Sequence, residues 1–131
     1  MIVGVDASAI VAIGLNEPER DDFLGVLDRA EAAFIAPVNV LEAGLAIVLR
    51  QRLMGLERYA SWLVGLGVAE VSVPGDAALE AYLLFGRGVH RAGLNLGDCF
   101  AYALAKQLDA PLLYKGDDFS VTDVTPALQP T

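Results

Sequence analysis

The chain has 131 residues, enough for one domain with a buried core and too few for two ordinary domains, so we expect a single domain spanning residues 1–131. Hydrophobic residues make up 55% of the chain, but polar residues interrupt the apolar stretches before the roughly 18 residues that a membrane-spanning helix needs. The net charge of −8 argues against a broad surface that grips phosphate groups through lysine and arginine.

The single cysteine, Cys99, has no partner for an intramolecular disulfide and no spacing typical of a zinc site. Its apolar neighbours indicate a buried, unreactive thiol. The first fifteen residues lack the basic start of an export signal and place Asp6 where such a signal is apolar. We therefore expect a cytoplasmic protein with no membrane association.

The first part of the chain alternates predicted strands and helices. The β-branched apolar run at its start is typical of a central parallel strand, Ser8 is suited to cap the helix that follows, and Pro37 suits the first turn of a long helix. The elements expected here are a strand at 1–5, helices at 9–15 and 23–30, a strand at 34–35 and a helix at 37–52.

The second part continues the same alternation. Three glycines around His90 predict a loop, and Asn95 is suited to open the helix after it. The expected elements are helices at 56–66, 77–85 and 95–108, strands at 71–73 and 112–114, and an edge strand at 121–124. Such alternation predicts a three-layer α/β/α sandwich with a mostly parallel sheet, in which ligands bind at the C-terminal ends of the strands.

Four acidic residues fall where this fold would bring them together. Asp6 and Asp117 each follow a predicted strand, and Glu42 and Asp98 each lie in the first turn of a predicted helix. If those helices begin at the same edge of the sheet, four carboxylates converge, which is unfavourable unless cations occupy the site. Carboxylate oxygens suit Mg²⁺ or Mn²⁺ better than zinc.

A cation held in this way can lower the pKa of a bound water and stabilise a leaving oxygen, which is the chemistry of phosphodiester hydrolysis. The sequence shows no convincing basic partner for its cysteine and no glycine-rich phosphate loop. Each acid alone also has an ordinary structural explanation, as a helix cap, a residue favoured by the helix dipole or part of a turn. The prediction of a metal-dependent hydrolase therefore depends on the four acids taken together.

Four segments, in this order and at this spacing, resemble the signature of the PIN-domain ribonuclease toxins of the VapC family: Val5-Asp6-Ala7-Ser8, Asn39-Val40-Leu41-Glu42-Ala43, Asn95-Leu96-Gly97-Asp98-Cys99-Phe100-Ala101 and Lys115-Gly116-Asp117-Asp118-Phe119. The resemblance implies a PIN-like sandwich with Mg²⁺- or Mn²⁺-dependent endoribonuclease activity, the toxin of a type II toxin–antitoxin system. It also implies a homodimer, an RNA substrate such as tRNA or rRNA, and inhibition by a VapB-like antitoxin.

The resemblance further implies the roles of individual side chains. Catalytic and metal-binding roles carry over to Asp6, Glu42 and Asp98, and we assign the fourth such position to Asp117 because it follows its strand more closely than Asp118. Asp118 and Ser8 are expected to support the acids without binding the metal directly.

Lys115 and Arg87 are the basic residues that we expect to contact RNA, whereas a loop histidine such as His90 is more often simply solvated. A receiver-like signalling domain also binds Mg²⁺ at strand ends and uses a lysine after a late strand, but this chain lacks its paired acids and its middle-strand aspartate. A PIN domain that binds without catalysis is the other alternative, which the intact acids disfavour.

Overall fold

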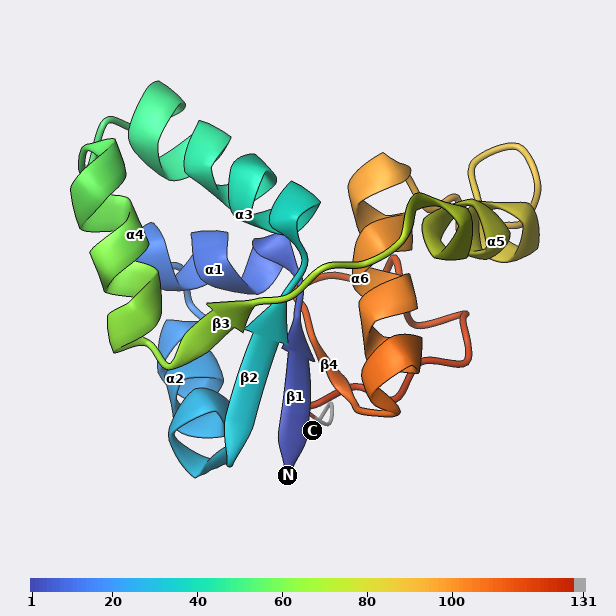
Figure 1. The fold of residues 1–131 in the computed structure, drawn as a ribbon, viewed down its shortest axis with the longest axis horizontal. Helices are drawn as coiled ribbons and strands as arrows, with labels where there is room; N and C mark the ends of the chain where they lie inside the picture. Colours follow the sequence, from blue (N-terminus) through green and yellow to red (C-terminus); the bar gives the residue numbers. More distant parts are fainter. Residues whose placement is uncertain (129–131) are drawn as a thin grey trace.

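One parallel sheet organises the chain. A computed structural model describes residues 1–128, and within them four strands pair side by side in the order β3-β2-β1-β4 (Figure 1). Every pairing is parallel, so the C-terminal ends of the strands lie at the same edge of the sheet. The strands are β1 (Ile2–Val5), β2 (Ala32–Ile35), β3 (Val68–Glu70) and β4 (Leu112–Leu113).

Helices cover both faces of this sheet. Figure 1 shows α1 to α4 on one side of the strands and α5 and α6 on the other. The helices are α1 (Ala7–Gly14), α2 (Arg20–Arg29), α3 (Pro37–Gly44), α4 (Leu56–Gly65), α5 (Gly75–Phe85) and α6 (Leu96–Leu108), and a π-helical segment, η1 (Leu45–Arg50), continues α3. The predicted α/β/α sandwich with a parallel sheet is confirmed.

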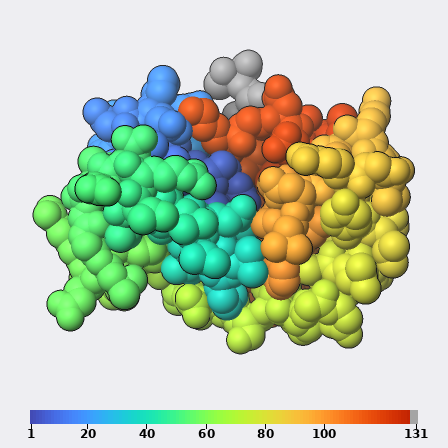
Figure 2. Space-filling view, turned by 90° about the horizontal axis from the view of Figure 1, so that it is seen from above, coloured from blue at the N-terminus to red at the C-terminus, as the bar shows by residue number. Residues whose placement is uncertain are grey.

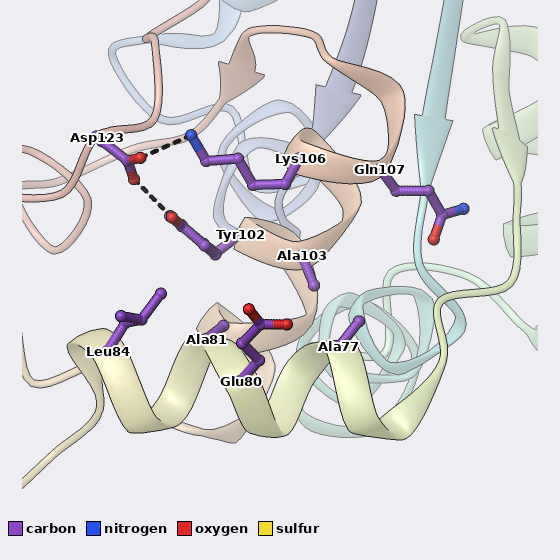
Figure 3. A pocket seen from close by; sticks show the side chains of 9 residues that line it. All are labelled: Ala77, Glu80, Ala81, Leu84, Tyr102, Ala103, Lys106, Gln107 and Asp123. Carbon is purple, nitrogen blue, oxygen red and sulfur yellow. Dashed lines mark hydrogen bonds and ion pairs between the residues drawn. The ribbon is translucent and has the colours of Figure 1, made fainter.

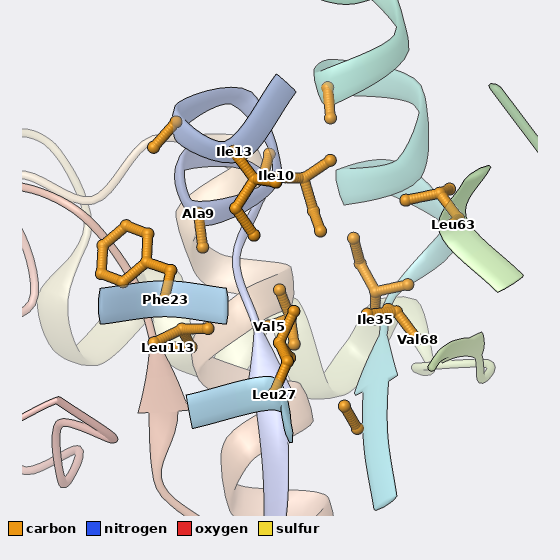
Figure 4. Packing of buried hydrophobic residues seen from close by; sticks show 14 of the residues in the cluster. Val5, Ala9, Ile10, Ile13, Phe23, Leu27, Ile35, Leu63, Val68 and Leu113 are labelled. Atoms are coloured by element: carbon orange, nitrogen blue, oxygen red, sulfur yellow. The ribbon is translucent and has the colours of Figure 1, made fainter. Parts of the chain in front are cut away.

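β1 is buried on both faces, as its unbroken apolar sequence predicts. Val3 and Val5 point into a core shared with Ile10 and Phe23 from the first two helices (Figure 4). Gly4 points the opposite way, and a Cβ at this position would meet the side chain of Leu104 on α6 at 3.6 Å. The strand thus joins the two helical layers and fixes the position of the residue that follows it.

Close packing on the first face depends on a glycine. A Cβ added to Gly14 would lie 2.8 Å from Cδ1 of Ile47 and 3.2 Å from the ring of Trp62, so a side chain there would require the Ile47 side chain to shift. The fully buried Ile47 shows how tightly this contact is filled.

Several predicted boundaries are wrong. The long helix predicted to end near residue 52 instead changes from α3 into the π-helical segment and ends at Arg50. The N-cap of α1 is Asp6, whose carboxylate accepts a hydrogen bond from the backbone N–H of Ser8. The expected cap, Ser8, already lies inside the helix.

The strand predicted at 71–73 is displaced to β3, at Val68–Glu70. Val71 donates one more backbone hydrogen bond to Ile35, and Val73 then packs against Ala36 and Leu104. Val73 is therefore buried and Val71 partly buried beyond the end of β3, outside the strand itself.

The edge strand predicted at 121–124 is also absent. Thr122 bends the chain by donating its hydroxyl to the carbonyl of Phe119. The next segment provides the contact with β4, since Leu112 donates to the carbonyl of Thr125 and accepts from the N–H of Ala127, each at 2.8 Å. Within residues 1–128, no helix is long and apolar enough to cross a membrane.

Candidate active site

The C-terminal edge of the sheet is the place where α3 and α6 meet the end of β1. Figure 2 looks onto this edge and shows α3, in teal, beside the start of α6, in orange, with the blue start of the chain between them. Among the predicted site residues, Asp6, Glu42 and Asp98 come from these three segments, which are far apart in sequence.

Asp6 is held firmly at the end of β1. Its carboxylate is almost fully buried, and its Oδ2 accepts hydrogen bonds from the N–H of Ser8 at 3.0 Å and from the hydroxyl of Ser8 at 2.5 Å. The Ser8 hydroxyl oxygen in turn accepts from the backbone N–H of Lys115 at 2.9 Å. Ser8 therefore links Asp6 to the segment that follows β4.

Glu42 lies in α3, one turn after Asn39. The Asn39 amide donates to Oε1 of Glu42 at 2.8 Å and also to the carbonyl of Gly97 at 3.0 Å. Asn39 is fully buried and so connects α3 with the start of α6 from inside the protein. Asn39 was not among the residues predicted to act at the site, although a polar residue one helical turn before a candidate acid was a signal that could have identified it.

Asp98 lies in the first turn of α6, as predicted. Asn95 caps the helix by accepting from the N–H of Asp98 at 2.9 Å, and the Asp98 carboxylate accepts from the N–H of Asn95 at 3.1 Å. This capping box sets the start of the helix and holds Asp98 half-buried.

The three acids share one electrostatic environment. Burial raises the pKa of Asp6 to about 7, the hydrogen bonds from Ser8 oppose this rise, and the charges of Asp98 and Glu42 add to it. Burial likewise raises the pKa of Asp98 to about 6, and Glu42 is among the charges that contribute. Both pKa values are raised first by poor hydration and second by neighbouring negative charge, a combination that is common at functional sites.

The two candidates for the fourth acid act on different neighbours. The charge of Asp118 raises the pKa of Asp98, whereas that of Asp117 acts on the Tyr114 hydroxyl. Both aspartates are exposed in the turn after β4. Closeness to the strand end therefore does not by itself decide between them, because the side-chain direction in a turn depends on the turn's backbone.

The two predicted RNA-contacting residues have different surroundings. Arg87, exposed in the loop after α5, is near enough to Asp98 for its charge to lower the pKa of that carboxyl. The ammonium group of Lys115 instead lies 3.0 Å from a carboxylate oxygen of Glu17 and 3.4 Å from one of Glu19, so it already has anionic partners within the protein.

The remaining candidates lie outside the acidic group. His90 folds back within its loop, where Nδ1 accepts from the N–H of Ala92 at 3.0 Å and the ring packs edge-on against Phe85. Cys99 is buried, and burial raises the pKa of its thiol to about 11, which keeps it protonated and unreactive as expected.

A separate hollow lies between α5 and α6 (Figure 3). There Asp123 accepts hydrogen bonds from the Tyr102 hydroxyl at 2.6 Å and from Lys106 at 2.9 Å. None of the predicted acids lines this hollow, and its polar groups fasten the segment after β4 to α6.

The donor set at the sheet edge fits a hard divalent cation, because its acidic ligands are all carboxylates and burial penalises their charged forms. In the arrangement described for residues 1–128, no three acidic, histidine or cysteine side chains are already grouped closely enough to hold an ion. The side chains nevertheless have the chemistry that such an ion requires.

Comparisons with known proteins found relatives that span most of the chain. Residues 3–124 match the PIN domain family. Ribonuclease VapC30 of Mycobacterium tuberculosis is 39% identical over 129 residues, which cover 96% of this chain and 98% of the relative. Ribonuclease VapC of Mycolicibacterium smegmatis is 42% identical over 123 residues, covering 92% of this chain and 95% of the relative.

The fold also resembles a solved structure. The crystal structure of Mycobacterium tuberculosis VapC20, described as a toxin that cleaves the sarcin-ricin loop, superposes with a TM-score of 0.78 at 14% identity, covering 98% of this chain and 99% of that one. A likeness at this identity concerns the fold alone, but the sequence relatives span nearly the whole chain. The chain therefore belongs to the PIN-domain family, and within it to the VapC ribonucleases.

Proposed function

We propose that this chain is an endoribonuclease that depends on Mg²⁺ or Mn²⁺ bound by Asp6, Glu42 and Asp98. The observation that carries the proposal is that these three carboxylates act on one another at one sheet edge, since burial and, to a smaller extent, the charges of Asp98 and Glu42 raise the pKa of Asp6 to about 7. Such an arrangement is unfavourable in the free protein and becomes favourable when a cation binds. As the fourth acid we now prefer Asp118, whose charge acts on Asp98, to Asp117.

A cation bound here supplies an activated water and stabilises the oxygen that leaves phosphorus. Asp6 provides a carboxylate that Ser8 holds in one orientation, and Glu42 is held in the same way by Asn39. Arg87, exposed beside Asp98, is placed to bind a phosphate group of the RNA backbone. Lys115 supports the site indirectly through its backbone N–H.

The biological role that we propose is that of the toxin in a type II pair, acting in the cytoplasm as a homodimer and inhibited by a VapB-like antitoxin. The VapC relatives support the pairing by their name, and VapC20 indicates ribosomal RNA as one substrate class to test. A groove between α3, η1 and α4 has an entirely apolar lining, with Leu41, Leu49 and Leu56 exposed, and this surface is suited to a protein partner.

Purified protein is expected to cut structured RNA when Mg²⁺ or Mn²⁺ is present and to stop when EDTA is added in excess. Gel analysis of end-labelled tRNA and rRNA fragments measures this, with excess Mn²⁺ added back to show that the loss is reversible. Cleavage that continues undiminished in EDTA would contradict metal dependence. A protein that binds Mn²⁺ and RNA without any cleavage would instead indicate a PIN domain that only binds.

A further inference from the structure

Asn39 combines complete burial with an incompletely satisfied amide. Its Nδ2 donates to Glu42 and to the carbonyl of Gly97, and both partners can only accept, which fixes the orientation of the amide. Its Oδ1 is buried with no hydrogen-bond partner among residues 1–128. A buried, unpaired acceptor destabilises a fold, and an apolar side chain of similar size would avoid this cost. An amide is therefore needed at this position for the two hydrogen bonds that it donates, to Glu42 and to Gly97.

On α6, the residue that accepts the hydrogen bond from Asn39 is Gly97, which has no side chain. A Cβ built on Gly97 would overlap both carboxylate oxygens of Glu42. The carboxylate of Glu42 thus occupies the space that any other residue at position 97 would fill. Since Gly97 directly precedes Asp98, this contact brings Glu42 up to the backbone that carries the next acid.

We propose that Asn39 and Gly97 are positioning residues that hold the Glu42 carboxylate against the start of α6, where it can share one divalent cation with Asp6 and Asp98. Asn39 provides the directional hydrogen bonds, and Gly97 provides the space. This inference rests on the proposed function, because it assigns these two residues to the cation site of that function. Partners that orient a metal-binding carboxylate contribute substantially to metal affinity.

The test compares Mn²⁺ binding and thermal stability in Asn39→Leu. Leucine has a similar size and removes both the donated hydrogen bonds and the unpaired acceptor, so the variant is expected to melt at or near the wild-type temperature. Its Mn²⁺ affinity is expected to fall roughly 10- to 100-fold, as is typical when an orienting partner is removed. If Asn39→Leu does not fold, Asn39→Ser keeps one donor and is expected to show a smaller loss in the same direction.

A matched control is Gln107→Leu. The Gln107 amide also donates to a backbone carbonyl, that of Ser72, but it lies at the opposite end of α6 from Asp98. This variant is expected to bind Mn²⁺ as the wild type does. Gly97→Ala is expected to weaken Mn²⁺ binding as much as Asn39→Leu, because the added methyl group displaces Glu42.

The outcomes distinguish the inference from the function on which it rests. If the wild type binds Mn²⁺ and cuts RNA while Asn39→Leu binds the ion equally well, the positioning role is overturned and the proposed function stands. If the wild type neither binds Mn²⁺ nor cuts RNA, the proposed function fails and the inference fails with it. Weaker binding in Asn39→Leu and Gly97→Ala, with binding in Gln107→Leu unchanged, supports the inference.

Discussion

Replacing Asp6 by asparagine is expected to abolish RNA cleavage and, at the same time, to stabilise the metal-free protein at about pH 8. The loss of activity follows from removing a carboxylate that binds the cation. The cation stabilises the transition state by several kcal/mol, so its loss corresponds to roughly a 1,000-fold fall in rate. Asparagine keeps the cap of α1 and can still accept the hydrogen bonds from Ser8, so the local structure is retained.

The gain in stability follows from the raised pKa of Asp6. A group whose pKa is about 7 in the folded chain, against 3.8 ordinarily, stabilises the fold most at pH values below 3.8. That contribution is lost as the pH rises from about 4 through 7, because the unfolded chain releases the proton first. At about pH 8 the neutral asparagine avoids this cost, which is about 4 kcal/mol.

Denaturant unfolding of the metal-free variant at about pH 5 and about pH 8, together with a cleavage assay, measures both effects. Asp28→Asn, at an exposed position on α2, serves as the control and should change neither stability nor activity. An Asp6→Asn protein that is less stable at about pH 8 than the wild type and still cuts RNA would contradict our description of this residue.

Mn²⁺ affinity is expected to increase steeply with pH, because bound cations must displace protons from Asp6 and Asp98. The pKa of Asp6 is about 7 and that of Asp98 is about 6. Between these two pH values the ion displaces one proton, from Asp6, and at lower pH it displaces a second, from Asp98. Affinity should rise about tenfold per pH unit between about pH 6 and 7, more steeply below this range, and level off above it.

Calorimetric titration of Mn²⁺ between about pH 5.5 and 8 measures this dependence, and two buffers with different ionisation enthalpies give the number of protons released. The Asp98→Asn variant provides the control, with weaker binding and one proton fewer released at the acidic end. Equal affinity across the whole range would show that neither carboxyl is coupled to the ion.

Local sequence signals predicted the parts of the fold that depend on neighbouring residues. The strand before Asp6 was recognisable because it is apolar on both faces, and α6 because Asn95 and Asp98 form a capping box within four residues. β3 was misplaced because its pairing with β2, and not its valine content, decides which residues join the sheet. The turn after β4 was read correctly as a turn, but its sequence did not show which of its two aspartates acts on Asp98.

In the candidate site, too, local sequence signals predicted the positions of the acids but not the contacts between distant residues. The positions of Asp6, Glu42 and Asp98 along the chain indicated a shared sheet edge, and the structure places them in one electrostatic environment. The contact between Glu42 and Gly97 joins residues far apart in sequence and depends on the absence of a side chain, which no local pattern reveals. The pairing of Lys115 with Glu17 and Glu19 is similarly non-local, so the sequence did not show that its ammonium group has anionic partners within the protein.

The most direct test of the central claim is to induce the chain in a bacterial host and map new RNA 5′ ends, in parallel with the Asp98→Asn variant. Our account predicts growth arrest and new 5′ ends at defined sites in structured RNA for the wild type, and neither effect for the variant at equal protein level. New 5′ ends at the same sites and in the same amounts with Asp98→Asn would contradict the claim that the carboxylates at this sheet edge cut RNA.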